Sequence, residues 1–411
     1  MEKKIQLQRI IQSWREFAIS EISLTLDRNY SLSFSKDLVN AIIGVRRSGK
    51  TTIAIQQVAT HTQQFLFMNF EDPFFSEYSS YIILDDLLDE YFNIYNENPK
   101  FIIFDEIHNI KNWERWVRKF IDQKKGFLVI TGSSSKLLNS ELSTSLTGRN
   151  LTKEVWPLSF AEYLQFLNIK KENFRSELIN YLKWGGFPRI TLESNEKLKT
   201  ELLRQYYSDT TLKDVINRNQ IRDVSALLAI FTFYLSNISS LHSYNSIKNA
   251  FNISINAAIS YTRALVSAFL IFEVKMYSKN LKIQSRNPIK IYTIDTGFRN
   301  INGMSSSDDQ GKLLENFVFL ELKKQNKEIY YHREKYECDF VITEHYKPVQ
   351  LIQVTTSLNN KDTYEREING LREAMMKYKI NEGLIITLND SGKINISEGI
   401  IRIVPAWSYF S

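Results

Sequence analysis

Short, continuous apolar runs alternate with segments of helical periodicity in the first third of the chain. The apolar runs cover residues 39–43, 64–70, 101–104 and 126–130. Runs of this length are typical of strands that are buried on both faces of a parallel sheet. Segments 51–60 and 111–120 between them predict amphipathic helices, and residues 1–35 predict a helix and its connection to the first strand. This alternation predicts an α/β fold with a parallel sheet.

Helical periodicity dominates the middle of the chain. Residues 166–225 have a helical pattern that is broken at 185–188, and they predict a helical lid. Two further helices, at 243–251 and 255–268, are separated by a polar turn and followed by a strand at 269–274. This order predicts a winged-helix-like block, in which residues 254–263 would form the recognition helix.

The last part of the chain, residues 287–411, has a mixed pattern. Helices are predicted at 313–322 and 364–378, and strands at 329–331, 338–342, 349–355 and 383–388. A third α/β block therefore follows the helical region.

A phosphate-binding loop of the form GxxxxGK[ST] occupies residues 44–51, between the first strand and the following helix. Its glycines let backbone N–H groups surround phosphate oxygens, and the helix presents its positive dipole end to the same anion. Lys50 can reach the β- and γ-phosphates, and the Thr51 hydroxyl can ligate Mg²⁺. The predicted nucleotide-binding residues are Gly44, Arg46, Arg47, Ser48, Gly49, Lys50, Thr51 and Thr52.

Two acidic residues follow the apolar run at 101–104. We expect Asp105 to hold Mg²⁺ and Glu106 to polarise the attacking water as a general base. His108 either senses the γ-phosphate or is a surface histidine beside a carboxylate. Together with the phosphate-binding loop, this acidic pair predicts hydrolysis of a nucleoside triphosphate.

Four further polar residues are candidates for the same site. Ser133 follows the strand at 126–130 and either senses the γ-phosphate or caps a helix at 136–138. Arg149 is a candidate arginine finger, acting in cis or on a neighbouring subunit. Glu71 and Asp72 either lie near Mg²⁺ and the attacking water or only terminate their strand.

The length, net charge and cysteine count limit the number of domains, the partners and the kinds of site that this chain can have. The 411 residues suffice for two or three domains, and the net charge of +6 permits a nucleic-acid partner without requiring one. Cys338 is the single cysteine, which excludes an intramolecular disulfide and a cysteine-based zinc cluster. The sequence shows neither a signal-peptide core nor an apolar window of about 18 residues, so we expect a cytoplasmic protein without a membrane span.

The motifs resemble those of the AAA-type P-loop ATPases of bacteria and archaea that carry a C-terminal domain of uncharacterised function. The matching stretches are residues 46–51, 69–73, 104–108, 131–134, 146–149, 158–163, 185–188 and 292–297. The resemblance implies ATP rather than GTP as the nucleotide, with Mg²⁺. A guanine-reading tetrapeptide (Asn/Thr-Lys-x-Asp) is missing after the second motif, which agrees with ATP.

The C-terminal block resembles a restriction-endonuclease-like core, whose active members place acids and a lysine around Mg²⁺. Glu315 and Asp339 match two acids, whereas Gln353 stands where the strand acid belongs and Thr355 where the lysine belongs. The resemblance therefore implies either a non-catalytic binding platform or a vestigial metal site at Glu315, Asp339 and Gln353.

The predicted domains are an N-terminal helix and its connection (1–35), an AAA-type ATPase domain (36–165), a helical lid (166–225), a winged-helix-like domain (226–286) and a restriction-endonuclease-like domain (287–411). We expect an ATP-hydrolysing switch or motor that acts on double-stranded DNA or on a protein partner, with the oligomeric state left open. The alternatives are an ATP-dependent nuclease that uses Glu315 and Asp339 and an ATP-gated protein-interaction switch without DNA. The basic cluster for DNA contact would be Lys275, Lys279, Lys282 and Arg286.

Overall fold

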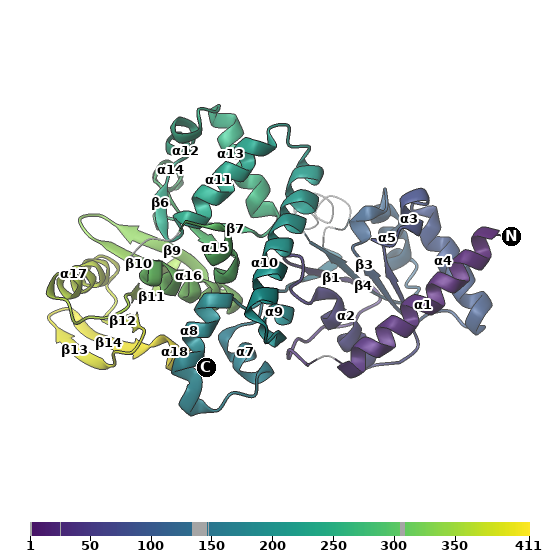
Figure 1. Ribbon diagram of the computed structural model, residues 1–411, viewed down its shortest axis with the longest axis horizontal. Helices are drawn as coiled ribbons and strands as arrows, with labels where there is room; N and C mark the ends of the chain where they lie inside the picture. Colours follow the sequence, from purple (N-terminus) through teal and green to yellow (C-terminus); the bar gives the residue numbers. More distant parts are fainter. Residues whose placement is uncertain (1, 25, 134–145, 147, 305–308) are drawn as a thin grey trace. The chain divides into compact units, whose positions relative to one another are not determined.

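The computed structural model describes the chain except for residues 1, 25, 134–145, 147 and 305–308 (Figure 1). The chain divides into two compact units, Met1–Val155 and Trp156–Ser411. The helix predicted at 136–138 lies outside the described residues. None of the described helices combines the length and apolarity that crossing a bilayer requires.

The first unit contains a five-stranded parallel sheet in the order β2-β3-β4-β1-β5. Its strands are β1 (Val39–Ile43), β2 (Phe65–Asn69), β3 (Phe101–Asp105), β4 (Phe127–Gly132) and β5 (Asn150–Glu154). The predicted parallel α/β fold is confirmed. Strand β5 was missed because it lies at the edge of the sheet and has a mainly polar sequence with no buried residue.

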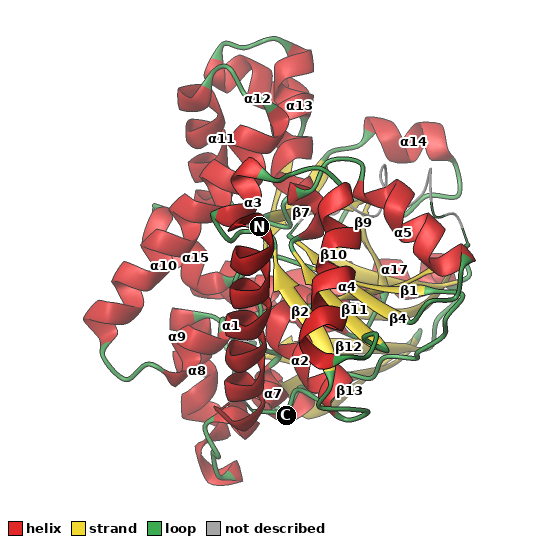
Figure 2. Ribbon diagram, turned by 90° about the vertical axis from the view of Figure 1, so that its right-hand side faces the viewer, coloured by secondary structure: helices red, strands yellow, loops and turns green. Residues whose placement is uncertain are grey.

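Helices pack on both faces of this sheet (Figure 2). They are α1 (Glu2–Leu24), α2 (Lys50–Ala59), α3 (Phe74–Glu77), α4 (Ile82–Tyr95) and α5 (Trp113–Asp122), with a 3₁₀ turn at Ile107–Asn109. One face of the sheet shares a hydrophobic cluster with Ala18 of α1 and Ile53 of α2. On the other face, Trp116 of α5 packs against Phe104 of β3, with ring centroids 5.6 Å apart. The carboxyl ends of the strands remain the edge at which the polar motifs gather.

The second unit begins with a series of helices, and the first two share a hydrophobic cluster with its C-terminal sheet. These helices are α7 (Phe160–Phe166), α8 (Phe174–Trp184), α9 (Pro188–Leu192), α10 (Glu196–Thr210), continued by a π-helix at Thr211–Asn217, and α11 (Val224–Ser236). Tyr181 of α8 packs edge-on against Phe317, which in turn packs against Phe410. The first part of the predicted helical region, including α8, therefore packs into a core shared with the C-terminal sheet, and the role of the region as a lid stays a prediction.

The buried carboxylate of Asp295 stabilises the interruption of this helical region at residues 185–188. Asp295 Oδ2 accepts a hydrogen bond from the Gly186 N–H at 2.8 Å, and Asp295 Oδ1 accepts one from the Gly297 N–H at 2.8 Å. Gly185 has a φ of +77°, and a Cβ there would stand 2.0 Å from Asp295 Oδ1. Gly185 is thus needed because the chain approaches Asp295 more closely than a side chain allows.

A small three-stranded antiparallel sheet, in the order β6-β8-β7, follows these helices. Its strands are β6 (Ser240–His242), β7 (Ile271–Lys275) and β8 (Ile289–Thr293), and its helices are α12 (Tyr244–Phe251), α13 (Ile255–Ser267) and α14 (Leu281–Arg286). The predicted helix, turn, helix and strand are confirmed as elements, while the winged-helix assignment stays a prediction. Lys282 and Arg286 of the predicted basic cluster lie on α14.

The C-terminal block is a six-stranded mixed sheet in the order β13-β14-β12-β11-β10-β9. Its strands are β9 (Glu328–Arg333), β10 (Glu337–Glu344), β11 (Lys347–Val354), β12 (Glu382–Thr387), β13 (Gly392–Ile396) and β14 (Gly399–Pro405). Its helices are α15 (Thr296–Asn302), α16 (Asp309–Lys324), α17 (Lys361–Tyr378) and α18 (Ala406–Tyr409). The four predicted strands and two predicted helices are confirmed, and β13 and β14 were missed.

Candidate functional site

The predicted phosphate-binding loop connects the carboxyl end of β1 to the amino end of α2. Gly44 has a φ of +146°, and a Cβ at this position would lie 2.0 Å from the Val155 carbonyl oxygen. Gly49 precedes α2 with a φ of +94°. Both positions require glycine, because one is crowded by backbone and both have a positive φ. The loop therefore turns back over the end of β1, where the N-terminal amides of α2 are exposed to a ligand.

Two polar side chains of this loop are buried and poorly satisfied. Lys50 is 5% exposed, and its Nζ donates to the Val45 carbonyl oxygen at 3.1 Å. The Ser48 hydroxyl is buried, and it has no hydrogen-bond partner among the residues that the structure describes. A buried ammonium with one weak backbone acceptor and an unsatisfied hydroxyl are suited to an anionic ligand that supplies several acceptor oxygens.

Thr51 and Asp105 meet beside the loop. The Thr51 Oγ1 lies 2.9 and 3.0 Å from the two carboxylate oxygens of Asp105, so it donates to that carboxylate. Asp105 also accepts from the Thr131 hydroxyl at 2.6 Å and from the Asn69 amide at 3.0 Å. These contacts give Asp105 a fixed orientation. Thr131 and Asn69 lie at the carboxyl ends of β4 and β2, the strands on either side of β3. No role was predicted for them from the sequence.

The electrostatics at Asp105 favour a cation. Burial, followed by the charge of Glu106, raises the pKa of Asp105 to about 6. A divalent cation beside this carboxylate would offset both effects, since it favours the charged form. A hydroxyl and a carboxylate oxygen are also the hard ligands that Mg²⁺ prefers. The residues present therefore fit Mg²⁺, which Thr51 and Asp105 would hold.

Glu106 is held in an unusual backbone conformation beside Lys50. Its φ is +52°, and its N–H donates to the Thr131 hydroxyl at 3.1 Å. The Glu106 Oε1 lies 3.8 Å from Lys50 Nζ, and Oε2 lies 3.3 Å from His108 Nδ1. A non-glycine residue with a positive φ stores strain that often marks a functional position. His108 is thus placed against the predicted general base and is only partly exposed.

The other candidates near the loop have different surroundings. Arg46 pairs with Glu71 at 2.7 Å, which attaches the loop to the turn after β2. Asp72 accepts from the Trp14 indole at 3.0 Å and from the Phe74 N–H at 2.9 Å, so it orders the start of α3. Ser133 is buried directly after β4, whose last residue pairs with the last residue of β1. It therefore lies at the same edge as the loop.

The structure does not bring Arg149 to this edge. Arg149 directly precedes β5, and its carbonyl oxygen accepts a hydrogen bond from the N–H of Val39, the first residue of β1. The phosphate-binding loop begins at the other end of β1, roughly 16 Å away at about 3.3 Å per residue. The Arg149 side chain pairs with Asp122. Action of Arg149 on a neighbouring subunit stays a prediction.

Arg28 is a loop partner that sequence analysis missed. It lies between α1 and β1, is 7% exposed, and donates from Nη1 to the Ser48 carbonyl oxygen at 2.6 Å. An arginine in the connection before a phosphate-binding motif has no fixed spacing from that motif, so the sequence alone does not indicate its role. Its role follows only from the packing of the N-terminal segment against the loop.

A second cluster of ionisable side chains lies in the second unit. Glu315 of α16 and Asp339 of β10 are brought together as predicted, but through a lysine that sequence analysis missed. Lys290 Nζ of β8 lies 3.0 Å from Glu315, 2.7 Å from Glu337 and 2.9 Å from Asp339. Lysine is common in strands and helices, so nothing in the local pattern distinguishes this one.

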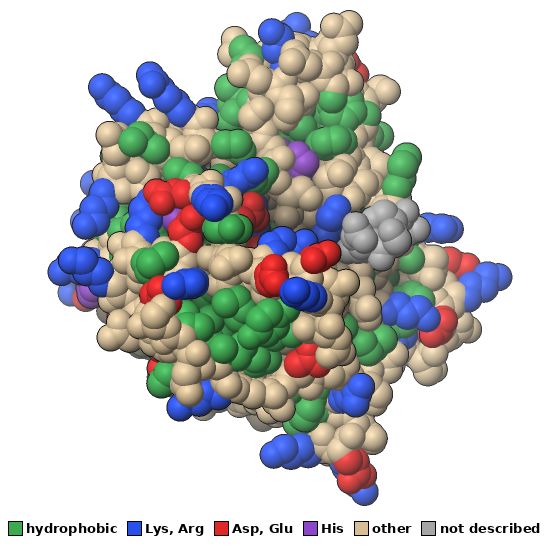
Figure 3. Space-filling view, turned by 90° about the vertical axis from the view of Figure 1, so that its left-hand side faces the viewer, with side chains coloured by type: hydrophobic (Ala, Val, Ile, Leu, Met, Phe, Trp, Pro, Cys, Tyr) green, Lys and Arg blue, Asp and Glu red, His purple; other side chains and the backbone are tan. Residues whose placement is uncertain are grey.

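Gln353 lies next to this cluster and uses both ends of its amide. Its Oε1 accepts from the Asp339 N–H at 3.2 Å, and its Nε2 donates to Glu367. Thr355 donates to the Ser357 carbonyl oxygen at 3.3 Å. These groups line a cavity of about 860 Å³, whose wall also includes Lys312, Arg333, Lys335 and Arg366. On the face drawn in Figure 3, acidic and basic side chains intermingle.

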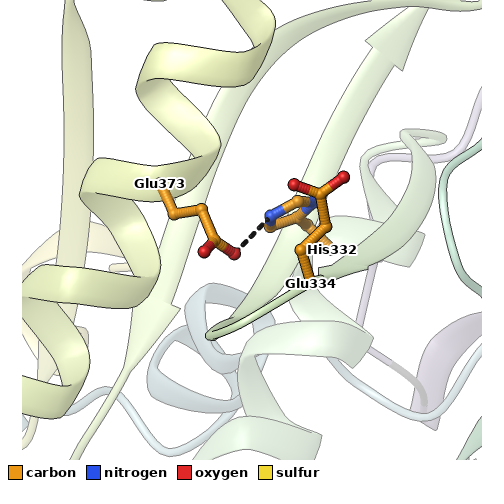
Figure 4. Close-up of side chains that lie close together, drawn as sticks. All are labelled: His332, Glu334 and Glu373. Carbon is orange, nitrogen blue, oxygen red and sulfur yellow. Dashed lines mark hydrogen bonds and ion pairs between the residues drawn. The ribbon is translucent and has the colours of Figure 1, made fainter.

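A third group is formed by His332, Glu334 and Glu373 (Figure 4). The figure shows Glu373 reaching from its helix toward the imidazole of His332. The His332 ring nitrogens lie 3.1 Å from Glu373 Oε1 and 2.9 Å from the Tyr378 hydroxyl. Glu334 pairs with Lys377. Because these contacts already engage both imidazole nitrogens and both carboxylates, this group is a hydrogen-bond network within the fold.

Three family profiles match the chain in succession. They are described as an AAA domain (residues 36–164), a domain of unknown function (DUF8612, residues 175–308) and a domain of unknown function (DUF4143, residues 310–409). The first match covers the sheet and motifs described above. The other two cover most of the second unit.

Two relatives cover most of this sequence. A protein of Methanocaldococcus jannaschii, described as uncharacterised, is 36% identical over an alignment of 438 positions. The alignment covers 100% of this chain and 96% of that protein. A protein of Haemophilus influenzae with the same description is 29% identical over 70% of this chain and 75% of its own length.

Among solved structures, a replication initiator DnaA bound to AMPPCP and single-stranded DNA matches 61% of this chain and 86% of its own. Its TM-score is 0.28 at 15% identity, which is too low to bear on function. The identity and coverage of the archaeal relative are sufficient to assign a family. The chain belongs to the same family as the Methanocaldococcus jannaschii protein, and its first unit contains an AAA domain of the P-loop ATPase type.

Proposed function

We propose that this protein is an ATP-hydrolysing molecular switch or motor whose reaction takes place in the first unit. The observation that carries the proposal is the contact between Thr51 and Asp105 at 2.9 Å, with Lys50 and Glu106 beside it. Few structural roles require a buried lysine, two carboxylates and a hydroxyl at the mouth of a glycine-containing loop. This combination supports phosphoryl transfer to water.

Each residue has a role that follows from its position. Lys50 and the amides of the loop bind the phosphates, and the developing negative charge is stabilised by the same donors. Thr51 and Asp105 would hold Mg²⁺, which when bound would neutralise charge on the phosphates. Glu106 accepts a proton from water at its carboxylate, and Ser133 and His108 are the proposed sensors of the γ-phosphate.

The partner of this ATPase is proposed from charge and fold. The basic cluster of Lys275, Lys279, Lys282 and Arg286 supports contact with the phosphates of double-stranded DNA. In the C-terminal block, the helix and strands that carry Glu315, Asp339 and Gln353 lie around one cavity. This arrangement supports a restriction-endonuclease-like fold used as a binding platform.

Steady-state ATP hydrolysis with Mg²⁺ tests the proposal, in wild type and in Glu106→Gln, with and without double-stranded DNA. We expect hydrolysis in wild type and a loss of about 100-fold or more in Glu106→Gln, because a positioned general base contributes about 10²–10⁴-fold. Glu97→Gln removes an exposed carboxylate of the same unit and is the matched control. Equal activity of Glu106→Gln and Glu97→Gln would contradict the proposed role of Glu106.

The DNA arm of the same experiment identifies the partner class. Stimulation by DNA that is lost in Glu106→Gln would support DNA as the partner. Hydrolysis that is indifferent to DNA would favour a protein partner, which the Glu106→Gln variant would retain in its ATP-bound state.

A further inference from the structure

Lys290 occupies the point at which three carboxylates of the second unit converge. Its ammonium lies 2.7 Å from Glu337, 2.9 Å from Asp339 and 3.0 Å from Glu315. Its side chain is 1% exposed. An ammonium has three hydrogens, so each carboxylate can accept one of them. The three carboxylates therefore surround the ammonium of Lys290.

A divalent cation in the same place would need the same oxygens. Mg²⁺ and Ca²⁺ bind oxygen ligands at about 2.0–2.6 Å from a common centre, and the common centre of Glu315, Glu337 and Asp339 is the Lys290 nitrogen. A metal ion could use these oxygens together only if the buried ammonium moved away. We propose that the Lys290 ammonium takes the place of a divalent cation in this cluster, which makes it a metal-independent site.

The remaining contacts orient the carboxylates toward the lysine. The second oxygen of Asp339 accepts from the Val354 N–H at 2.9 Å, and the Tyr292 hydroxyl donates to Glu315 Oε1 at 2.7 Å. Strands on two sides of the cluster thus fix the acids in the geometry that surrounds Nζ. A metal ion in this place would have to break the contacts of Lys290 with these acids.

The neighbours of Lys290 keep its ammonium charged. Gln353 presents a neutral amide to this cluster and hydrogen-bonds at both ends. Burial alone would lower the pKa of Lys290, but Asp339 and Glu315 reverse this effect and raise its pKa well above the ordinary value. Burial, followed by the charge of Asp339, raises the pKa of Glu315 to about 8. The lysine therefore stays charged among the three acids.

The acids of the cluster also line the adjoining cavity. Its lining includes Glu315, Glu337 and Asp339 together with the cations Arg333, Lys335 and Arg366. Ligands of this cavity would be held by side chains without a bridging metal ion.

Mn²⁺ binding to the full-length, nucleotide-free protein tests the proposal. Isothermal titration and Mn²⁺ electron paramagnetic resonance would compare wild type, Asp339→Asn, Lys290→Met and the double variant Lys290→Met/Asp339→Asn. We expect wild type and Asp339→Asn to bind Mn²⁺ equally weakly. Lys290→Met should gain one site with at least about tenfold tighter binding, and Mn²⁺ should raise its Tm; the double variant should lose both gains.

Two results would overturn the proposal. One is a stoichiometric Mn²⁺ site in wild type that Asp339→Asn removes, because the ammonium would then not exclude the metal. This comparison does not depend on the folding of Lys290→Met. The other is a Lys290→Met protein that unfolds cooperatively but gains no Mn²⁺ site. If Lys290→Met does not fold, Lys290→Gln replaces it in the same comparison.

Discussion

Each unit contains a buried lysine beside carboxylates, yet the two lysines have different partners. Lys50 Nζ lies 3.1 Å from a backbone oxygen and 3.8 Å from one carboxylate, whereas Lys290 Nζ lies within 3.0 Å of three carboxylates. Within the described part of the chain, Lys50 thus retains hydrogens for phosphate oxygens, and Lys290 has an acceptor for each hydrogen. Both lysines are buried, so burial does not distinguish them. The number of carboxylate partners does: a lysine with few partners can bind a ligand, whereas one with three stabilises the fold.

The largest expected effect is the loss of stability when Lys290 is removed. Lys290→Ala leaves three carboxylates facing one another in a buried cluster, and breaking a buried ion pair costs about 3–5 kcal/mol. Chemical denaturation should therefore show a lower free energy of unfolding for the second unit.

Lys183→Ala is the matched control for this change. Lys183 also lies 2.9 Å from a carboxylate, that of Glu196, but both side chains are more than half exposed. An exposed pair contributes about 0–1 kcal/mol. Equal losses for Lys183→Ala and Lys290→Ala would mean that burial of the cluster is not what stabilises the second unit.

The next effect is on activity and concerns the other lysine. Lys50→Ala should lower ATP hydrolysis by about 100-fold or more, because it removes a donor to the transferred phosphate. The free energy of unfolding should fall by only about 1 kcal/mol, since Lys50 makes one backbone hydrogen bond and one long contact with a carboxylate. Phosphate release and denaturation of the same preparation would measure both. A Lys50→Ala protein that keeps its activity would remove the proposed distinction between the two lysines.

The same comparison explains which site could be predicted from the sequence. The phosphate-binding loop, the strand that precedes it and the helix that follows it are contiguous, so the spacing of Gly44, Lys50 and Thr51 predicted their proximity. Asp105 was also predictable, because parallel strands end at a common edge. Thr131 and Asn69 lie at the same edge, but hydroxyl and amide residues at strand ends are too common to indicate a role.

The lysine cluster could not be predicted in this way. Glu315 and Asp339 were found through a resemblance, but Lys290 belongs to a strand of a different sheet. Its approach depends on how the small antiparallel sheet packs against the C-terminal block. The edge strands β5 and β13 were missed for a related reason: their partly exposed, polar sequences lack the apolar runs that mark central strands.

A smaller effect tests the backbone of the nucleotide site. Gly44→Ala places a Cβ 2.0 Å from the Val155 carbonyl oxygen in a residue with a positive φ, and we expect a loss of about 1–3 kcal/mol from overpacking. Gly148→Ala is matched, because its φ of +73° is also positive but no atom lies within 4 Å of the added Cβ. Thermal unfolding of both variants separates crowding from backbone strain. A larger loss for Gly148→Ala would contradict the close approach at Gly44.

The smallest expected effect concerns Arg28, which contacts the phosphate-binding loop from the connection between α1 and β1. Arg28→Lys keeps the charge but loses the planar guanidinium that donates to the Ser48 carbonyl oxygen at 2.6 Å. Because this bond orients the loop and has no part in the chemical step, KM for ATP should rise by up to about tenfold, or about 1.4 kcal/mol, while kcat changes little. Arg15→Lys, which alters a cation stacked 4.4 Å from the Tyr95 ring in the same unit, should change neither constant. A fall in kcat at constant KM would instead place Arg28 in the chemical step, and the nucleotide site would then depend on a distant residue for catalysis as well as for binding.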